Sequence, residues 1–487
     1  MNYRMIFNTT AKVLITLGLL LFLPFIVALC YQENSALYIL ISSAIALVVG
    51  FSMKQLSKPK TNVIYAREGF IIVTFAWLAL SVVGCLPFYL SGEIPSFIDA
   101  FFETVSGFTT TGASILTNVE DMSRCLLFWR SFTHWIGGMG IIVFIIAINK
   151  KITERSIHVL RAEMPGPTVD KLVPRAKDTS IILYLIYTAL TLLEIILLCF
   201  GDMDLFESIV YSLGTAGTGG FATKADGLAS YSAYSQWVIA IFMFIFAINF
   251  NLFYLTIIGK IKNVLKSTEF KTYVIIVFAS IAIVSINIYP QIENLSEVLR
   301  LSTFQVTSII STTGYSTADF NLWPQLSKTV LVILMFIGGC AGSTAGGLKV
   351  SRIVLLFKRV LIEFKRIIHP RAVDVVKSEG KTVDDDTVNS IGIYIALYAL
   401  CFFIIFVLIS IFGGSFSDGT NLFETHFTAV ISCINNIGPG FNAVGPMGSF
   451  ANYSPISKLI LSFTMLLGRL ELYPLLITLS PSTWTRK

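Results

Sequence analysis

Long apolar stretches recur along the whole chain and are separated by shorter polar segments. A helix needs about 20 consecutive apolar residues to span a bilayer, and ten stretches approach or exceed that length. They lie near residues 12–31, 36–53, 69–91, 126–148, 181–200, 235–258, 272–289, 329–357, 390–413 and 456–479. The pattern predicts an all-α polytopic membrane protein with ten spans. The first stretch lacks a small-residue cleavage site, so we interpret it as a helix rather than a secretory signal.

Composition and charge support this prediction. The 487 residues are 55% hydrophobic and only 13% charged, with a mean hydropathy of +0.77, far above ordinary soluble domains. Of the 35 Lys and Arg residues, 24 lie in the loops 54–67, 150–177, 260–271 and 349–381. By the positive-inside rule these loops face the cytoplasm, and an even number of spans places both termini there. This distribution explains the net charge of +6 without nucleic acid.

A polar motif centred on glycine occurs four times between the apolar stretches. The motifs are TTTGAS (109–114), GTGGFAT (217–223), STTGYS (311–316) and NNIGPGFN (435–442). Each follows a segment with helical spacing that is too short to span, namely 96–108, 204–214, 295–309 and 421–433. We interpret each unit as a re-entrant helix and loop, because non-helical backbone at membrane depth must be buried in protein or line water.

The repeat divides the chain into an N-terminal helix pair and four similar units. The expected boundaries are 1–60 for the pair and 61–150, 151–262, 263–380 and 381–487 for the units. Four Gly-centred loops around one axis would form an ion filter, because carbonyl oxygens can replace the water shell of a cation. Glycine lets successive carbonyls point the same way, and the C-terminal ends of the short helices favour a cation. One such motif alone is a common turn; four in matching context favour the filter.

The eighth apolar stretch is interrupted by GGCAGSTAGG, residues 338–347. Glycines and hydroxyl side chains at this density unwind a helix. A nucleotide-binding loop is rejected, since Gly347 is followed by Leu348 rather than by Lys and Ser or Thr. Tight helix packing through small residues is the alternative interpretation.

Arg469 and Glu194 are charged residues that lie well inside apolar stretches. Arg469 is deep in the last one, where a charge is costly and usually functional; snorkelling to an interface is the weaker interpretation, and a pairing with Glu471 is possible. Glu194 matches no motif and is assigned no role; a helix-packing contact is one interpretation. The seven Cys and four His residues are scattered without metal-ligand spacing, so neither a metal site nor the paired groups of an intramembrane enzyme are predicted.

The four motifs, together with GGCAGSTAGGLKVSR (338–352) and GRLELYPLL (468–476), resemble the Trk/Ktr/HKT superfamily of potassium transporters over almost the whole chain. The two extra N-terminal helices resemble its TrkH-type potassium uptake subunits. The resemblance implies four M1-P-M2 repeats in pseudo-four-fold arrangement around one pore, with K⁺ bound at Thr110, Thr111, Gly112, Thr218, Gly219, Gly220, Thr312, Thr313, Gly314, Asn436, Ile437 and Gly438. Asn436 and Ile437 depart from the Thr pattern.

The resemblance also implies how transport is controlled. Residues 338–347 would be an intramembrane gate beneath the filter, formed by Gly338, Gly339, Gly342, Ser343, Thr344, Gly346 and Gly347 and steadied by Arg469. It implies a homodimer in the bacterial cytoplasmic membrane and a cytoplasmic TrkA-type subunit that binds NAD and ATP or ADP. The basic loops 150–177 and 349–381 are candidate docking surfaces for that subunit, and the alternative is that they are ordinary positive-inside determinants. The chain itself is expected to bind no cofactor and to be no enzyme. A rocking carrier with inverted repeats is the rival within transport.

Overall fold

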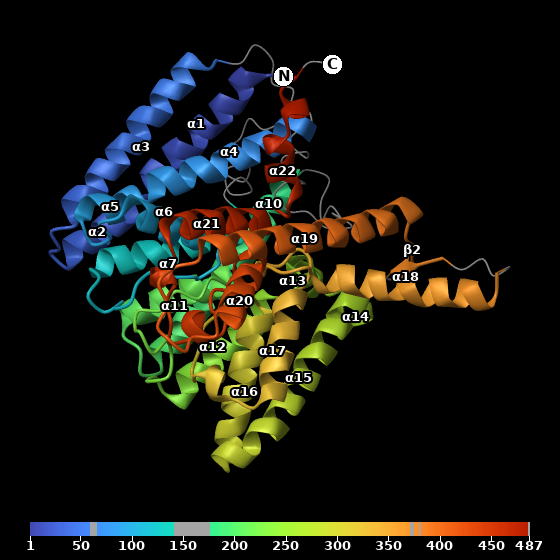
Figure 1. The fold of residues 1–487 in the computed structure, drawn as a ribbon. Coiled ribbons are helices and arrows are strands. Elements are labelled where there is room, and N and C mark those ends of the chain that lie inside the picture. The colour runs from blue at the N-terminus through green and yellow to red at the C-terminus, as the bar shows by residue number, and fades with distance from the viewer. Residues whose placement is uncertain (59–65, 141–175, 371–374, 379–380, 486–487) are drawn as a thin grey trace.

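The computed structural model describes residues 1–58, 66–140, 176–370, 375–378 and 381–485. At the N-terminus, α1 (Tyr3–Leu20) and α2 (Phe22–Cys30) form one nearly continuous apolar helix, and α3 (Ala36–Leu56) follows it. Figure 1 shows α1, α3 and α4 side by side, and α1 packs on both of the others. The predicted N-terminal helix pair is therefore present, although its first helix begins nine residues before the predicted stretch.

Three kinds of helix then repeat four times. The long first helices are α4 (Ala66–Gly84) with α5 (Leu86–Ser91), α10 (Ala176–Cys199), α15 (Thr268–Ile292) and α19 (Asp385–Phe412). The short helices are α6 (Phe97–Phe108), α11 (Leu205–Gly217), α16 (Leu295–Ile310) and α20 (Leu422–Asn435). The second helices are α7 (Arg124–Gly138), α12 (Ala233–Phe246) with α13 (Phe250–Ile257), α17 (Gln325–Ile337) with α18 (Val350–Ile368), and α21 (Pro455–Arg469) with α22 (Tyr473–Leu479).

Small elements connect the repeats. They are helix α14 (Ile261–Lys266), the 3₁₀ turns η2 (Phe320–Leu322), η3 (Asn442–Val444), η4 (Phe450–Asn452) and η5 (Pro481–Thr483), and an antiparallel pair of strands, β1 (Lys377–Ser378) and β2 (Lys381–Thr382). In the strand pair Lys377 lies opposite Thr382.

The four short helices begin in the same way. At each N-terminus a polar side chain accepts a hydrogen bond from a backbone N–H of the first turn, and the first turn holds a carboxylate. The capping residues are Ser96, Asp204, Asn294 and Asn421, and the carboxylates are Asp99, Glu207, Glu297 and Glu424. Both features stabilise a helix N-terminus. They explain why helices too short to span start at the positions that the sequence predicts.

The repeats close into a ring. The second helix of each repeat packs against the short helix of the next one: α7 on α11, α12 on α16, α17 on α20, and α21 back on α6. The last contact joins the end of the chain to its beginning, so the four repeats surround a common axis in the same sense. This arrangement confirms the predicted all-helical class and supports the pseudo-four-fold placement of the units.

The second helices are interrupted more often than the hydropathy predicts. The described residues hold six helices long and apolar enough to cross a membrane, and a seventh if α12 and α13, which are bent by 93°, count as one span. Stretches 235–258 and 456–479 are broken at 247–249 and 470–472, and 329–357 is broken at 338–349 as expected. Stretch 126–148 is helical to Gly138, and residues 141–175 lie outside the described part.

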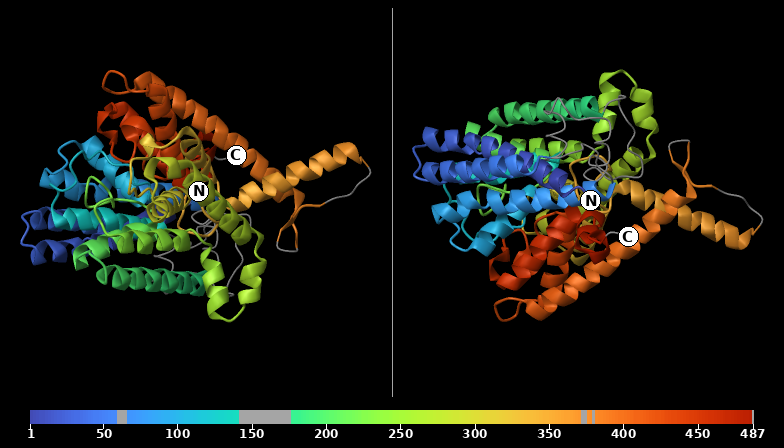
Figure 2. Two further views of the ribbon diagram at one scale, coloured as in Figure 1. Left: turned by 90° about the horizontal axis from the view of Figure 1, so that it is seen from below. Right: turned by 90° about the horizontal axis from the view of Figure 1, so that it is seen from above.

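The predicted basic loop 349–381 contains a long helix instead. Helix α18 alternates Lys and Arg with apolar residues at helical spacing and projects from the body beside the start of α19, as both views of Figure 2 show. Contacts of Leu355 and Ile362 with a small apolar cluster hold α18 against α19. The other basic loop, 150–177, falls almost entirely outside the described residues.

A candidate ion pathway lined by four glycine segments

The four Gly-centred segments share one backbone conformation. Two residues before each glycine, a non-glycine residue adopts a left-handed conformation: Thr110, Thr218, Thr312 and Asn436 have φ of 55°, 54°, 57° and 56°. The glycines are left-handed too, with φ of 79° at Gly112, 80° at Gly220, 85° at Gly314 and 102° at Gly438, whereas the residue between has negative φ. Positive φ is uncommon for residues with a Cβ, so its recurrence at four equivalent positions marks a constrained site.

The ends of the short helices impose this conformation. The backbone N–H of the residue before each glycine donates to a carbonyl five residues earlier, which is the bond of a Schellman motif. These bonds join Thr111 to Ser106, Gly219 to Gly214, Thr313 to Ser308 and Ile437 to Ser432, at 2.9, 2.9, 2.9 and 3.0 Å. Each segment therefore leaves its helix through the same turn and presents its next backbone groups in the same direction.

The four glycines form a closed ring. The carbonyl oxygen of the residue before each glycine approaches the Cα of the glycine in the preceding repeat so closely that a Cβ would collide with it. The pairs are Gly112 with Gly219, Gly220 with Thr313, Gly314 with Ile437, and Gly438 with Thr111. The last pair is the loosest, since a Cβ on Gly438 would lie 2.8 Å from the Thr111 oxygen. Only glycine fits these positions, because both the φ angle and the neighbouring carbonyl exclude a side chain.

Cavities lie on both sides of the ring. A cavity of ≈ 470 Å³ is lined by all four glycines and by the residues that follow them. A second cavity, of ≈ 60 Å³, is lined by Asn436 and by residues of the loop 338–349, here called the hairpin loop. Thr312 contacts the hairpin loop directly, because its hydroxyl accepts from the backbone N–H of Gly346 at 2.6 Å. The hairpin loop thus abuts the ring on the side opposite the larger cavity.

Backbone hydrogen bonds hold the base of the hairpin loop. Leu348, Lys349 and Val350 donate to the carbonyls of Phe336, Ile337 and Gly339 at 3.1, 3.0 and 3.0 Å, so α17 and α18 remain joined across the interruption. One carboxylate oxygen of Glu269 on α15 accepts from Ala341 at 2.7 Å and from Ser351 at 3.1 Å. These contacts support the unwound backbone that the sequence predicts at 338–347.

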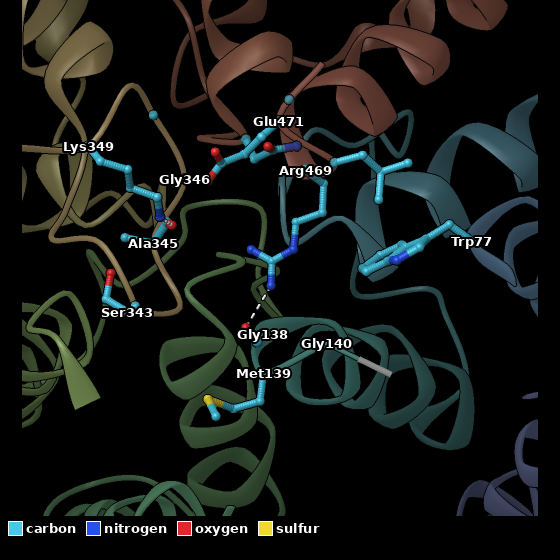
Figure 3. A pocket seen from close by; sticks show the side chains of 15 residues that line it. Trp77, Gly138, Met139, Gly140, Ser343, Ala345, Gly346, Lys349, Arg469 and Glu471 are labelled. Atoms are coloured by element: carbon cyan, nitrogen blue, oxygen red, sulfur yellow. Dashed lines mark hydrogen bonds between the residues drawn. The ribbon is translucent and has the colours of Figure 1, made fainter. Parts of the chain in front are cut away.

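The breaks in three second helices and the C-terminal end of α7 lie around the hairpin loop. Its Cys340 N–H donates to Ala247 at 2.9 Å, in the break between α12 and α13. Its Gly347 N–H donates to Asn435 at 3.1 Å, just before the fourth segment. Arg469, the last residue of α21, donates to Thr344 of the loop at 3.1 Å and to Gly138 at the end of α7 at 2.6 Å. Figure 3 shows the Arg469 guanidinium inside the smaller cavity, directed at Gly138.

The possible pairing of Arg469 with Glu471 is replaced by a different one. Glu471 forms a buried ion pair with Arg352 in the first turn of α18, and the Arg352 guanidinium lies 4.3 Å from the centre of the Tyr394 ring. The Arg469 guanidinium instead donates to backbone carbonyls, including that of Gly137. Carbonyl oxygens at a helix C-terminus carry partial negative charge, which stabilises a cation there.

Sequence reasoning missed two residues beside the ring, Arg130 and His134 of α7. His134 was one of the scattered histidines without metal spacing, and Arg130 was not singled out. Both are buried and contact the segment after Gly220. The position of Arg130 inside the apolar stretch 126–148 is a signal that could have singled it out, but its partners and those of His134 in the second repeat lie about 90 residues away. Glu194, by contrast, is buried between α10 and α11 near Thr215 and lines neither cavity, and among the described residues its carboxylate oxygens have no hydrogen-bond partner, so its role stays open.

The fold and the site together define a multi-pass membrane protein in which four equivalent segments meet on one axis between two cavities. Residues 36–486 match the TrkH family, described as a cation transport protein, and the chain belongs to that family. It is 34% identical to the Trk system potassium uptake protein TrkH of Escherichia coli K12, over 99% of this chain and 100% of that protein. It is 30% identical to TrkH of Halomonas elongata over the whole of both chains.

A solved structure is similar over the full length. The crystal structure of the potassium transporter TrkH from Vibrio parahaemolyticus matches with a TM-score of 0.89 at 30% identity and covers 100% of both chains. The predicted membership of the superfamily is thereby confirmed. The relatives are named as transporters, which agrees with the expectation that the chain moves ions rather than catalyses a reaction.

Proposed function

We propose that this protein takes up K⁺ across the bacterial cytoplasmic membrane, conducting it through the ring formed by Gly112, Gly220, Gly314 and Gly438. The observation that carries the proposal is the closed ring itself, in which each glycine faces the carbonyl of the next segment. Carbonyl oxygens of Thr110, Thr111 and their counterparts replace the hydration shell of the ion. The membrane potential drives uptake with about 2.3 kcal/mol per charge per 100 mV. The names of the relatives, potassium uptake proteins, support the choice of ion.

The residues around the ring suit a cation. Four short helices direct their C-terminal, partially negative ends at the axis from positions fixed by their caps. The four repeats run in the same direction around the axis. This favours a pore over a rocking carrier, whose inverted halves would run in opposite directions. Potassium channels carry Thr-Val-Gly-Tyr-Gly in all four filter loops. Here Ala113, Phe221 and Pro439 follow three of the glycines and only Tyr315 matches, so we expect discrimination against Na⁺ to be incomplete.

The gate in this proposal is the hairpin loop. It lies between the ring and the smaller cavity, and its Gly346 N–H binds the Thr312 hydroxyl at 2.6 Å. Arg469 places a positive charge in the same cavity, where it opposes the passage of a second cation and holds the loop through Thr344. In the closed state both groups obstruct the path, and conduction requires the loop to leave its contacts with the ring.

Regulation and assembly complete the proposal. A cytoplasmic TrkA-type subunit that binds NAD and ATP or ADP acts on the gate through the basic surface of α18, which connects directly to the hairpin loop. The protein assembles as a homodimer, and both termini face the cytoplasm. The relatives belong to a Trk system, which implies further subunits.

The test of the function is flux into proteoliposomes: K⁺ and Rb⁺ should enter with a positive current that collapses without a gradient, whereas equal impermeability to all alkali ions would refute it.

We expect the substitution Arg469→Gln to increase K⁺ flux. The variant loses a charge beneath the ring and the charge-assisted bonds to the loop and to α7, each typically worth about 1.5–3 kcal/mol. Because these bonds favour the closed loop, basal flux should rise about tenfold or more. The measurement is ⁸⁶Rb⁺ uptake by proteoliposomes, with Arg366→Gln, an exposed arginine on α18, as the control. Flux at the wild-type level would contradict a closing role for Arg469.

A further inference from the structure

Arg130 and His134 lie one turn apart on α7 of the first repeat and reach the second repeat. Arg130 is 2% exposed and His134 is fully buried. Both contact Phe221, the residue directly after the ring glycine Gly220. The Arg130 guanidinium lies 3.9 Å from the centre of the Phe221 ring, and the His134 ring centre lies 4.2 Å from it. The Phe221 side chain is thus held between a cation and an imidazole that belong to the neighbouring repeat.

The Arg130 guanidinium connects three segments at once. It donates to Glu103 of α6 through Nε at 2.9 Å and forms an ion pair with the same oxygen through Nη2 at 2.7 Å. Nη1 donates to the carbonyl of Ala222 at 3.2 Å, and Nη2 donates to the Ser114 hydroxyl at 3.3 Å. The first short helix, the segment after Gly112 and the segment after Gly220 are therefore joined by one rigid fork, a geometry that only arginine provides.

Glu103 completes the arrangement from the other side. Its carboxylate accepts from the backbone N–H of Ile115 at 3.0 Å and from the Ser114 hydroxyl at 2.9 Å. The Glu103 side chain is fully buried, so the pair with Arg130 neutralises two charges that would otherwise be very costly there. The first and second ring segments are consequently fixed to a common ion pair beside the larger cavity, which Arg130 lines.

His134 adds a second tie with a defined tautomer. Its Nδ1 lies 2.8 Å from the carbonyl oxygen of Gly107, which can only accept, so Nδ1 carries the proton. Its Nε2 accepts from the backbone N–H of Phe221 at 3.3 Å. The neutral imidazole therefore joins the first short helix to the backbone immediately after Gly220.

The other junctions between ring segments are built differently. Tyr315 donates to the carbonyl of Phe221 at 3.3 Å, Asn442 donates to the Asn321 side chain at 2.9 Å, and Asn436 donates to the Thr111 hydroxyl at 2.9 Å. Among the described residues, the junction of the first and second repeats is the one braced by a buried ion pair that contacts the ring segments. The ring is thus reinforced unequally.

We infer that Arg130 is a positioning residue that fixes the second ring segment against the first and thereby sets the discrimination between K⁺ and Na⁺. This inference rests on the proposed filter. Selectivity in a carbonyl-lined filter depends on the number, spacing and rigidity of the oxygens. Phe221 and Ala222 directly follow Gly220, so releasing them from Arg130 frees the carbonyls of Gly219 and Gly220 to move.

The test is a comparison of variants in proteoliposomes with K⁺, Rb⁺ and Na⁺. Arg130→Met combined with Glu103→Leu removes the pair without leaving a lone buried charge. We expect the K⁺ to Na⁺ flux ratio to fall at least about tenfold, which corresponds to about 1.4 kcal/mol. Arg130→Lys, which keeps the charge but not the fork, should shift the ratio in the same direction by less. If the double variant does not fold, the flux ratio of Arg130→Lys alone tests the inference.

The control is a second ion pair, which joins α18 to the start of α19. Arg359 and Asp385 lie 3.7 Å apart and line neither cavity, so Arg359→Met with Asp385→Leu should leave the flux ratio unchanged. Folded Arg130 variants with a wild-type ratio would overturn the inference. Gly314→Ser measured in parallel separates the two claims: if it lowers the ratio while the Arg130 variants do not, the filter stands and the positioning role fails.

Discussion

Replacing Gly314 by serine should abolish the preference for K⁺ over Na⁺ and reduce K⁺ flux by about tenfold or more, a change of about 1.4 kcal/mol in ion stabilisation. Gly314 has φ of 85°, and a Cβ there would collide with the carbonyl oxygen of Ile437. The third and fourth segments must therefore separate. The oxygen that moves is one of those proposed to coordinate the ion. We therefore expect the substitution to impair ion selectivity more than it destabilises the fold.

The control for this substitution is Gly392→Ser in α19. A Cβ at Gly392 would meet no heavy atom within 4 Å outside its own helix, and its φ is not positive, so serine is accommodated there without displacement of neighbours. The measurement is the ratio of ⁸⁶Rb⁺ to ²²Na⁺ uptake by proteoliposomes at equal protein content. An unaltered ratio in folded Gly314→Ser would exclude this glycine from the conduction path.

Shortening the hairpin loop by Ser343, Thr344 and Ala345 should raise K⁺ flux about tenfold or more, because the obstruction below the ring is withdrawn. The deletion removes the Thr344 carbonyl that binds Arg469 and shortens the tip that carries Gly346. It leaves the bonds between 336–339 and 348–350 that join α17 to α18. The helices should therefore keep their places while the tip no longer reaches Thr312.

Ser343→Ala serves as the control for the deletion. The Ser343 hydroxyl donates to Cys340 within the loop, so its removal keeps the loop length and the contacts with the ring. Single-channel or flux recordings without any regulatory subunit measure the effect directly. A deletion variant that conducts no more than Ser343→Ala would show that the hairpin loop is not the gate.

The sequence predicted the features that local chemistry decides. The four short helices begin within one residue of the predicted segments at 96, 204, 295 and 421, because a capping side chain and a first-turn carboxylate are visible in the sequence. Their ends follow from the glycine motif. The interruption at 338–347 was equally readable, since glycines in that density do not continue a helix.

The remaining features depend on partners distant in sequence. The break at 470–472 lies in LELYPLL, where Pro474 signals a helix end that hydropathy alone does not report. The left-handed conformation of Glu471 and Leu472 accompanies the tertiary position of Glu471 beside Arg352. The break at 247–249 contains Asn249, which caps the start of α13, and bonds to Cys340 and Gly342 of the hairpin loop stabilise it. Hydropathy reports which residues avoid water and carries no information about such backbone partners.

The central claim is that a cation binds on the axis of the glycine ring. Anomalous diffraction from crystals grown with Tl⁺ or Rb⁺ in place of K⁺ tests it most directly. We predict an anomalous peak enclosed by the carbonyls of Thr111, Gly219, Thr313 and Ile437 that is lost in Gly314→Ser. Anomalous peaks confined to other parts of the protein, with none on this axis in the wild type, would contradict it.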